Sequence, residues 1–170
     1  ASHTFEFPVI HAGTFWYHSH SDLQVQKGLY GAVVLSEAHT DDSTDERVVL
    51  FSDWTNERVE SVLGNLKAKD DFYSFKRDTI QSWDRVLGNG ADAIRNRLRG
   101  SISRMGPMDL ADVGYDAFLV NGQREGSVTD ISTENKQMKL RMINGSTSTY
   151  YDVEYAAGPM TIIAADGQDV

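Results

Sequence analysis

Short runs of β-branched and aromatic residues, many of them next to a glycine or an Asn-Gly or Asp-Gly pair, recur along most of this chain. Such runs predict short β-strands, because these side chains pack well on a pleated sheet and the dipeptides suit hairpin turns. An all-β chain is therefore expected. The runs are FEFPVI at 5–10, GTFWYHSH at 13–20, GLYGAVVL at 28–35, RVVLFSDW at 47–54, DAFLVNGQ at 116–123, KQMKLRMINGSTSTYYDVEY at 136–155 and MTIIAADGQDV at 160–170.

Two stretches between these strands have helical rather than alternating spacing of apolar residues. One begins near Val59, and the other is Ala91 to Arg104, which has arginines on its second face. They predict two or three surface helices inserted in a β domain, at about 57–104. The apolar positions are Val59, Val62, Leu63 and Leu66 in the first, and Ile94, Leu98 and Ile102 in the second.

Composition excludes several classes of site. A net charge of −9 and a pI near 4.9 argue against a nucleic-acid groove or an anionic membrane surface, since both need clustered Lys and Arg. The chain has no cysteine, so it contains no thiolate ligand, disulfide or Cys nucleophile. No apolar run has membrane-spanning length, so no membrane insertion is expected, and the first residues do not have the pattern of an export signal.

Two of the five histidines, His18 and His20, lie one residue apart directly after an aromatic run. Because side chains alternate along a strand, Trp16, His18 and His20 are expected on one face, with the two histidine backbones roughly 6–7 Å apart. Neutral imidazoles on a strand suit Cu, Zn, Fe or Ni. Two ligands are too few for a closed site, so others must come from elsewhere. The alternative is a pair of hydrogen-bonded histidines on a half-buried strand.

The residues around this pair resemble a motif of a known family. GTFWYHSH, followed by Gln24, Gly28, Leu29 and Gly31, is similar to the second copper-binding motif of the multicopper oxidases, Gly-Thr-x-Trp-Tyr-His-Ser-His with Gln, Gly-Leu and Gly at the same offsets. The resemblance covers nearly the whole chain. Its later parts indicate a subgroup of the family and say little about the copper chemistry. In order, SDWT, LKAKDDFYSF, MGPMDLADV, FLVNGQ, LRMINGS and AADGQ resemble landmarks of the copper resistance protein A subgroup.

That resemblance implies cupredoxin domains, which are Greek-key β-sandwiches, in a protein that reduces dioxygen to water at a trinuclear copper centre. Electrons would arrive one at a time through a type 1 copper, from Cu(I) or from phenolic compounds. His18 and His20 would each ligate one copper of the type 3 pair. The family also implies the periplasm and a role in copper resistance.

On this resemblance the chain divides at an acidic segment. Residues 1–36 would be the C-terminal part of a first cupredoxin domain, and 37–46 an acidic linker, whose Asp, Ser and Thr are typical of an exposed connection. Residues 47–170 would be much of a second cupredoxin domain, with the helical insertion inside it and truncation at its end left open.

The resemblance also places further copper motifs outside these 170 residues. A His-x-His-Gly would lie before Ala1, and the Cys and histidines of the type 1 site would lie after Val170, so the type 1 and type 2 sites would be completed there. We therefore predict that this chain alone is inactive. Two alternatives stay open: a copper-binding cupredoxin protein without turnover, and a laccase-like phenol oxidase with no role in copper tolerance.

The remaining candidates receive structural interpretations. No catalytic residue beyond the metal ligands and no substrate-binding residue can be named from the sequence. Met105 and Met108 in RMGPM could bind Cu(I) through their thioethers, but methionines beside a Gly-Pro turn more often pack. Trp16 and Tyr17 could pack around the copper cluster and shield it, but aromatic residues on a strand more often belong to the core. We expect a structural role for His11, solvated side chains for His3 and His39, a solvated acidic rim for Asp22, Asp41, Asp42 and Asp45, and a turn rather than a glycosylation site at Asn144 to Ser146.

Overall fold

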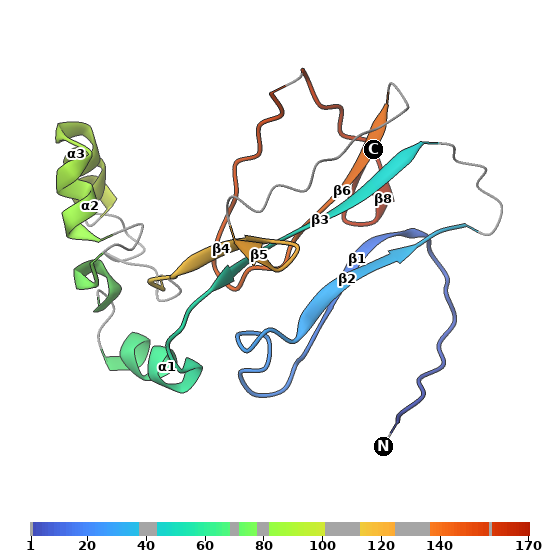
Figure 1. The fold of residues 1–170 in the computed structure, drawn as a ribbon, viewed down its shortest axis with the longest axis horizontal. Coiled ribbons are helices and arrows are strands. Elements are labelled where there is room, and N and C mark those ends of the chain that lie inside the picture. Colours follow the sequence, from blue (N-terminus) through green and yellow to red (C-terminus); the bar gives the residue numbers. More distant parts are fainter. Residues whose placement is uncertain are drawn as a thin grey trace.

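Figure 1 shows the fold in a computed structural model, which describes residues 2–37, 44–68, 72–77, 82–100, 113–124, 137–156 and 158–170. A two-stranded hairpin packs against a four-stranded sheet, and the helices gather at one end. The strands are β1 (Gly13–His18), β2 (Tyr30–Leu35), β3 (Asp45–Trp54), β4 (Ala117–Val120), β5 (Gln123–Arg124), β6 (Met138–Asn144), β7 (Ala164–Ala165) and β8 (Gln168–Asp169).

Strands β1 and β2 form an antiparallel hairpin in which His18 lies opposite Tyr30 and Tyr17 lies opposite Gly31. The ring of Tyr17 covers Gly31 so closely that a Cβ added to this glycine would lie 2.5 Å from the ring. Gly31 is therefore required by the close approach of an aromatic ring from the neighbouring strand.

The larger sheet has the strand order β5-β4-β3-β6. Its central strand, β3, pairs antiparallel with β4 and parallel with β6, the parallel register running from Asp45 opposite Met138 to Phe51 opposite Asn144. A parallel pair needs a long connection between its strands. Here the helices and the β4–β5 hairpin lie in that connection, which carries the chain to one end of the sheet and back (Figure 1).

The two dipeptides expected to form tight turns do so. Asn121 and Gly122 join β4 to β5 with φ angles of 50° and 76°, and Asp166 and Gly167 join β7 to β8 with the same two values. Positive φ at both central positions defines the type I′ turn, which matches the twist of the strands it connects.

The helices are α1 (Val59–Ala68), the 3₁₀ helix η1 (Phe72–Phe75), α2 (Trp83–Gly88) and α3 (Ala91–Gly100). Val59 and Val62 of α1 are buried, as their spacing predicts. The predicted end of the second helix, residues 101–104, lies outside the described residues. None of the helices in the described part of the chain is long and apolar enough to cross a membrane.

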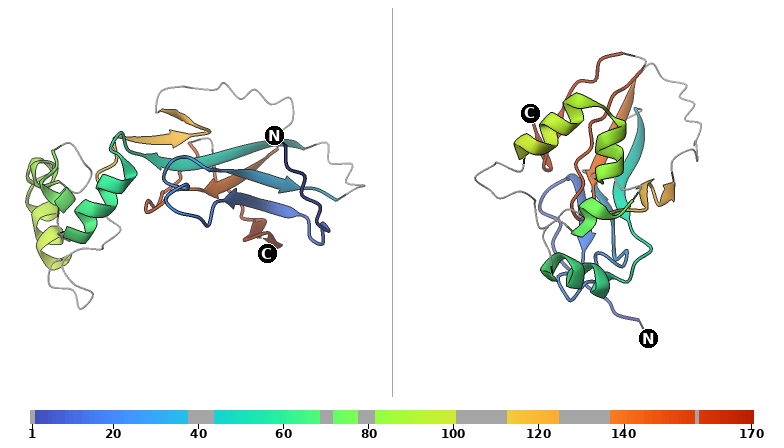
Figure 2. Two further views of the ribbon diagram at one scale, coloured as in Figure 1. Left: turned by 90° about the horizontal axis from the view of Figure 1, so that it is seen from below. Right: turned by 90° about the vertical axis from the view of Figure 1, so that its left-hand side faces the viewer.

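An ionic network joins the helical insertion to the sheet. The Lys76 Nζ donates to Glu57 Oε1 at 2.6 Å and to the Gly114 carbonyl at 3.1 Å, and Asp116 Oδ1 lies 3.8 Å away. Tyr73, which is 3% exposed, donates to the other carboxylate oxygen of Glu57. These contacts hold η1 against the end of β3, so the helices at one end of the sheet in Figure 2 belong to the same folded unit.

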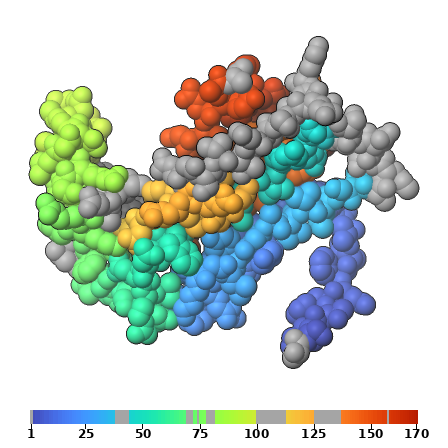
Figure 3. Space-filling view, viewed as in Figure 1, coloured from blue at the N-terminus to red at the C-terminus, as the bar shows by residue number. Residues whose placement is uncertain are grey.

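Two predicted strands are absent from the described residues, and one begins early. Residues 4–10 and 150–156 are irregular, although both contain strand-forming residues, and Phe5 is 84% and Tyr150 95% exposed. Alternation says which side of a segment is apolar, but a strand also needs a neighbour to bond its backbone. Figure 3 shows the N-terminal segment standing away from the sheets, and among the described residues no strand pairs with it. Strand β3 begins at Asp45 rather than at Arg47.

One charged group links the hairpin to the larger sheet. Arg141 on β6 donates two hydrogen bonds of 2.8 Å to Glu46 on β3, and a third of 2.7 Å to the hydroxyl of Thr14 on β1. The Lys139 ammonium lies 2.8 Å from the same carboxylate. Hydrogen bonds from Arg141 first, and then from Lys139, hold the pKa of Glu46 below its ordinary value.

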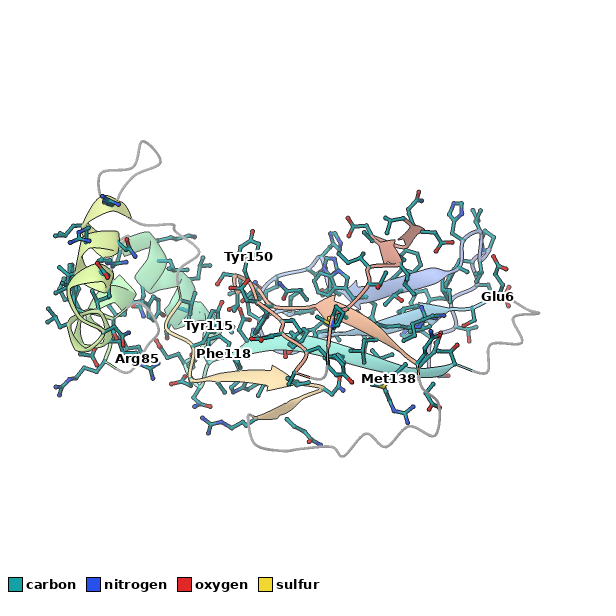
Figure 4. All side chains as sticks on the ribbon, turned by 90° about the horizontal axis from the view of Figure 1, so that it is seen from above. Glu6, Arg85, Tyr115, Phe118, Met138 and Tyr150 are labelled. Atoms are coloured by element: carbon teal, nitrogen blue, oxygen red, sulfur yellow. The ribbon has the colours of Figure 1, made fainter. Side chains whose placement is uncertain are left out.

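An aromatic cluster completes the packing beneath the sheet. The rings of Phe51 and Tyr151 stack with centroids 5.0 Å apart, and Phe118 meets Tyr151 and Tyr115 edge to face. Figure 4 labels Tyr115 and Phe118 where the sheet gives way to the helices. Strands thus dominate the structure and the helices form an insertion, so the all-β class predicted from the sequence is confirmed.

Candidate metal centre

The imidazoles of His18 and His20 lie together at the open end of β1, as the alternation predicts. The Trp16 ring stacks on His18 with centroids 4.2 Å apart and planes 18° apart, and His18 stacks on His20 at 4.6 Å and 28°. Both imidazoles are exposed. The three rings therefore form one stack that begins over the strand and ends in solvent.

One hydrogen bond determines the tautomer of the neutral His18 ring. The Nδ1 atom of His18 lies 3.2 Å from the carbonyl oxygen of Ser19. A carbonyl only accepts, so in the neutral imidazole Nδ1 is the donor and Nε2 keeps its lone pair. Among the described residues, neither His18 Nε2 nor the ring of His20 makes any hydrogen bond. Unused imidazole lone pairs are what a metal ion requires.

The pair does not complete a site by itself. Within the described ranges, no three His, Asp or Glu side chains come close enough together to hold a metal ion. The donors nevertheless fit copper, which imidazole nitrogen binds well. The two histidines can thus supply part of a ligand set, and the rest must come from outside the described residues.

The other predicted residues divide into three groups. His3 and His11 are exposed and lie away from the stack, and Asp22 is exposed and 4.0 Å from the ammonium of Lys27. Tyr17 is 54% exposed, so the expectation that it packs in the core is wrong; its ring covers a glycine on the sheet surface instead. His39, Asp41, Asp42, Met105 and Met108 lie outside the described residues.

Three further expectations concern residues in strands. Trp16 is half-buried, and its ring packs on an imidazole rather than in a core. Asp45 is half-buried at the start of β3, so it does not belong to a solvated rim. Asn144 forms the expected turn: its Oδ1 accepts from the backbone of Ser146, and its Nδ2 donates to the Thr149 carbonyl.

Sequence reasoning missed the most heavily hydrogen-bonded carboxylate among the described residues. Asp53, 8% exposed, accepts four hydrogen bonds of 2.8 to 3.1 Å from the backbone and side chains of the loop after β6. Its donors are more than ninety residues away, so only the SDWT motif could have drawn attention to it. The donors are the amide and hydroxyl of Thr147, the amide of Ser148 and the hydroxyl of Thr149.

A cavity of about 190 Å³ lies between this loop, α1 and the segment that follows His20. Its wall is mainly apolar, with Leu23, Trp54 and Val62 among its residues, and Tyr115 lies at its polar end. The Tyr115 hydroxyl is 2.7 Å from Thr147 Oγ1 and 2.8 Å from Ser148 Oγ, and burial raises its pKa to about 12. This phenol stays protonated and internally bonded, so it offers no acid–base group near neutral pH.

Comparison with known proteins agrees with this geometry. A family model described as multicopper oxidase matches residues 1–40, which include both histidines. Copper resistance protein A of Escherichia coli is 40% identical over 99% of this chain, and that of Pseudomonas syringae pv. tomato is 36% identical over 99%. Multicopper oxidase MmcO of Mycobacterium tuberculosis is 28% identical over 98%. No solved structure gives a significant match.

The fold, the exposed imidazole pair and these matches define the class: the chain belongs to the multicopper oxidase family. Within that family it is similar, over nearly its whole length, to the copper resistance proteins A. Copper is the cofactor of this family. The chain spans 29% of the length of the two copper resistance proteins and 31% of the mycobacterial oxidase.

Proposed function

We propose that this chain is part of a copper-dependent oxidase of the copper resistance type, in which His18 and His20 each ligate one copper of the type 3 pair. The complete oxidase takes electrons from Cu(I) or from phenolic compounds and reduces dioxygen to water. Export to the periplasm is part of the proposal, and so is the division into the end of one cupredoxin domain at 1–36, a linker at 37–46 and a second domain at 47–170.

The observation that carries this proposal is the stack of two exposed imidazoles with unused lone pairs at the end of β1. Both rings are exposed, so their nitrogens need no protein partner and can be reached by an ion, while stacking with Trp16 holds them in place. In His18 only Nδ1 makes a hydrogen bond, to the Ser19 carbonyl, and the ring of His20 makes none to any described residue. The structure thus keeps two nitrogens available at one edge of the hairpin.

The relative orientation of the rings favours two ions over one. Metal ions bind imidazole in the plane of the ring, about 2.0–2.1 Å from nitrogen. The two rings are stacked, with planes 28° apart and centroids 4.6 Å apart, so their in-plane lone pairs lie in separate, nearly parallel planes. Each ring therefore suits its own ion, and two neighbouring ions are the arrangement found in metal pairs that act on a shared substrate.

The role of this chain's own residues is to bind and orient. The copper centre, once complete, supplies the redox chemistry, accepting electrons singly and delivering them to dioxygen. His18 and His20 hold their nitrogens on a stiff strand end, and Trp16 covers the free face of His18. The hydrogen bond from Nδ1 to the Ser19 carbonyl keeps His18 in the tautomer that binds through Nε2.

The direct test uses the longer oxidase that we propose, loaded with copper, with oxygen uptake measured on Cu(I) and on a phenol. His18→Ala and His20→Ala should each abolish oxygen reduction and lower the copper content per chain. His11→Ala is the matched control, because this exposed histidine lies on the same approach to β1 and should leave both quantities unchanged.

Three results discriminate among the functions. Oxygen uptake on Cu(I) supports the copper resistance oxidase, whereas uptake on phenols alone supports the laccase-like alternative. Copper binding without uptake on either donor supports a non-catalytic copper protein. Full activity and full copper content in both histidine variants would contradict the metal centre itself.

A further inference from the structure

We propose that Gln24 is a positioning residue for the imidazole pair, acting through the hydroxyl of Ser19; the inference rests on the proposed function. Ser19 is the residue between the two histidines. Its Oγ donates to Gln24 Oε1 at 2.6 Å and accepts from the backbone amide of Ser21 at 3.0 Å. The short side chain between the ligands is therefore tied to the loop that follows them.

The backbone of Gln24 connects that loop to the next strand. Its carbonyl oxygen accepts from the amide of Leu29 at 2.9 Å and from that of Lys27 at 3.1 Å. Leu29 directly precedes Tyr30, which lies opposite His18 in the hairpin. Gln24 thus closes a ring of contacts from the end of β1, through Ser19 and the loop, to the start of β2.

His20 needs this support more than His18 does. His18 is the last residue of β1, so the pairing with β2 fixes its backbone, and Trp16 stacks on its ring. His20 lies two residues beyond the strand, and its described contact is the stack on His18. Without an anchor at Ser19, rotation of the intervening backbone would carry the His20 ring away from His18, at an entropic cost to the binding of two neighbouring ions, one at each ring.

Groups that orient a metal ligand without touching the metal commonly change its affinity about 10- to 100-fold. Gln24 has the geometry of such a group, because it touches neither imidazole yet fixes the residue between them. We expect its loss to weaken metal binding at His20 more than at His18. This asymmetry is what a general loss of stability would not produce.

The experiment is a Zn²⁺ titration of this chain, followed by the imidazole NMR signals of His18 and His20. Zn²⁺ binds imidazole nitrogen and is diamagnetic, and assigned signals separate this pair from the other histidines. In the wild type both signals should shift with Zn²⁺. In Gln24→Ala and in Ser19→Ala the dissociation constant seen at His20 should rise about tenfold, and ring-to-ring contacts between the imidazoles should be lost in the metal-free chain.

Three comparisons isolate the hydrogen bond. The double variant should bind no more weakly than either single variant, since both remove one interaction. Ser19→Thr keeps a hydroxyl and should retain wild-type affinity. Gln26→Ala is the matched control: it removes an amide from the same loop that no described residue hydrogen-bonds.

Two results would overturn the inference, and they differ. Unchanged affinity at His20 in a folded Gln24→Ala or Ser19→Ala variant contradicts the positioning role and leaves the metal centre intact. Wild-type signals of His18 and His20 that ignore Zn²⁺, while those of other histidines respond, contradict the proposed metal centre and the positioning role together.

Discussion

Two polar sites lie at strand ends: the imidazole pair at the end of β1 and Asp53 near the end of β3. They differ in how many hydrogen bonds their side-chain atoms make. Asp53 is buried and uses both oxygens in four hydrogen bonds to one loop. The imidazoles of His18 and His20 are exposed, and in the described part of the chain they make a single hydrogen bond, from His18 Nδ1 to the Ser19 carbonyl. A buried group whose hydrogen bonds are all made inside the protein holds the fold together, whereas exposed imidazole nitrogens are still able to bind a ligand.

The two sites should also differ in their contribution to the stability of the fold. A buried carboxylate without its donors would be expensive, so the loop at 147–149 and Asp53 stabilise each other. Exposed imidazoles cost little, and their removal should leave the fold intact. Variants at the two sites should therefore move different quantities: stability at Asp53, and metal binding at the histidines.

The largest effect on stability is expected at Asp53. Asp53→Ala removes four hydrogen bonds to a buried charge and leaves two backbone amides unpaired, which should lower the free energy of unfolding by about 3 kcal/mol. Chemical denaturation measures it. Glu154→Ala, at an exposed carboxylate, should change stability by less than about 0.5 kcal/mol. Equal effects of the two would remove the contrast between saturated and open sites.

A smaller, pH-dependent effect is expected at Glu46, which joins the two sheets through Arg141. Its pKa is lowered in the folded state, so its contribution is complete above the ordinary value of 4.5 and is lost as pH falls through the lowered pKa. Glu46→Gln should cost about 1 kcal/mol at neutral pH and nothing in strong acid. Melting temperatures of both proteins between pH 7 and pH 3 test this, and parallel curves would contradict it.

Gly31 should show how tightly the hairpin that presents the imidazoles is packed. Gly31→Ala forces the ring of Tyr17 off the strand and should cost about 1 kcal/mol. In a Tyr17→Ala background the same substitution should cost almost nothing, because the obstructing ring is gone. Additive effects in the double variant would show that the close approach is not the cause.

The smallest effect is a stabilisation. Gly64 lies inside α1 with open space where a Cβ would lie, so Gly64→Ala should raise the free energy of unfolding by about 0.5–1 kcal/mol. This glycine serves as the control for Gly31, since the same chemical change has the opposite sign. Thermal unfolding of both variants gives the comparison, and destabilisation by Gly64→Ala would contradict it.

The sequence predicts local features of this molecule better than distant ones. Alternation places Trp16, His18 and His20 on one face, and Asn-Gly and Asp-Gly specify their turns, because each depends on a few adjacent residues. The copper assignment came from resemblance, since two histidines alone suit several metals.

Features that depend on distant partners could not be predicted. The donors to Asp53 come from a loop that follows another strand, and residues 4–10 alternate like a strand but have no described strand beside them. Exposure of Tyr17 follows from the glycine opposite, which becomes its neighbour only once the register is known. Pairing and register are properties of the whole sheet, so a local pattern does not contain them.

We propose that each imidazole of this pair binds its own copper ion. The most direct measurement is anomalous X-ray diffraction at the copper edge from crystals of the complete, copper-loaded oxidase. We expect two neighbouring copper peaks, one in the ring plane of His18 next to Nε2 and the other at His20. A single ion bound by both rings, or no copper within bonding distance of either histidine, would contradict it.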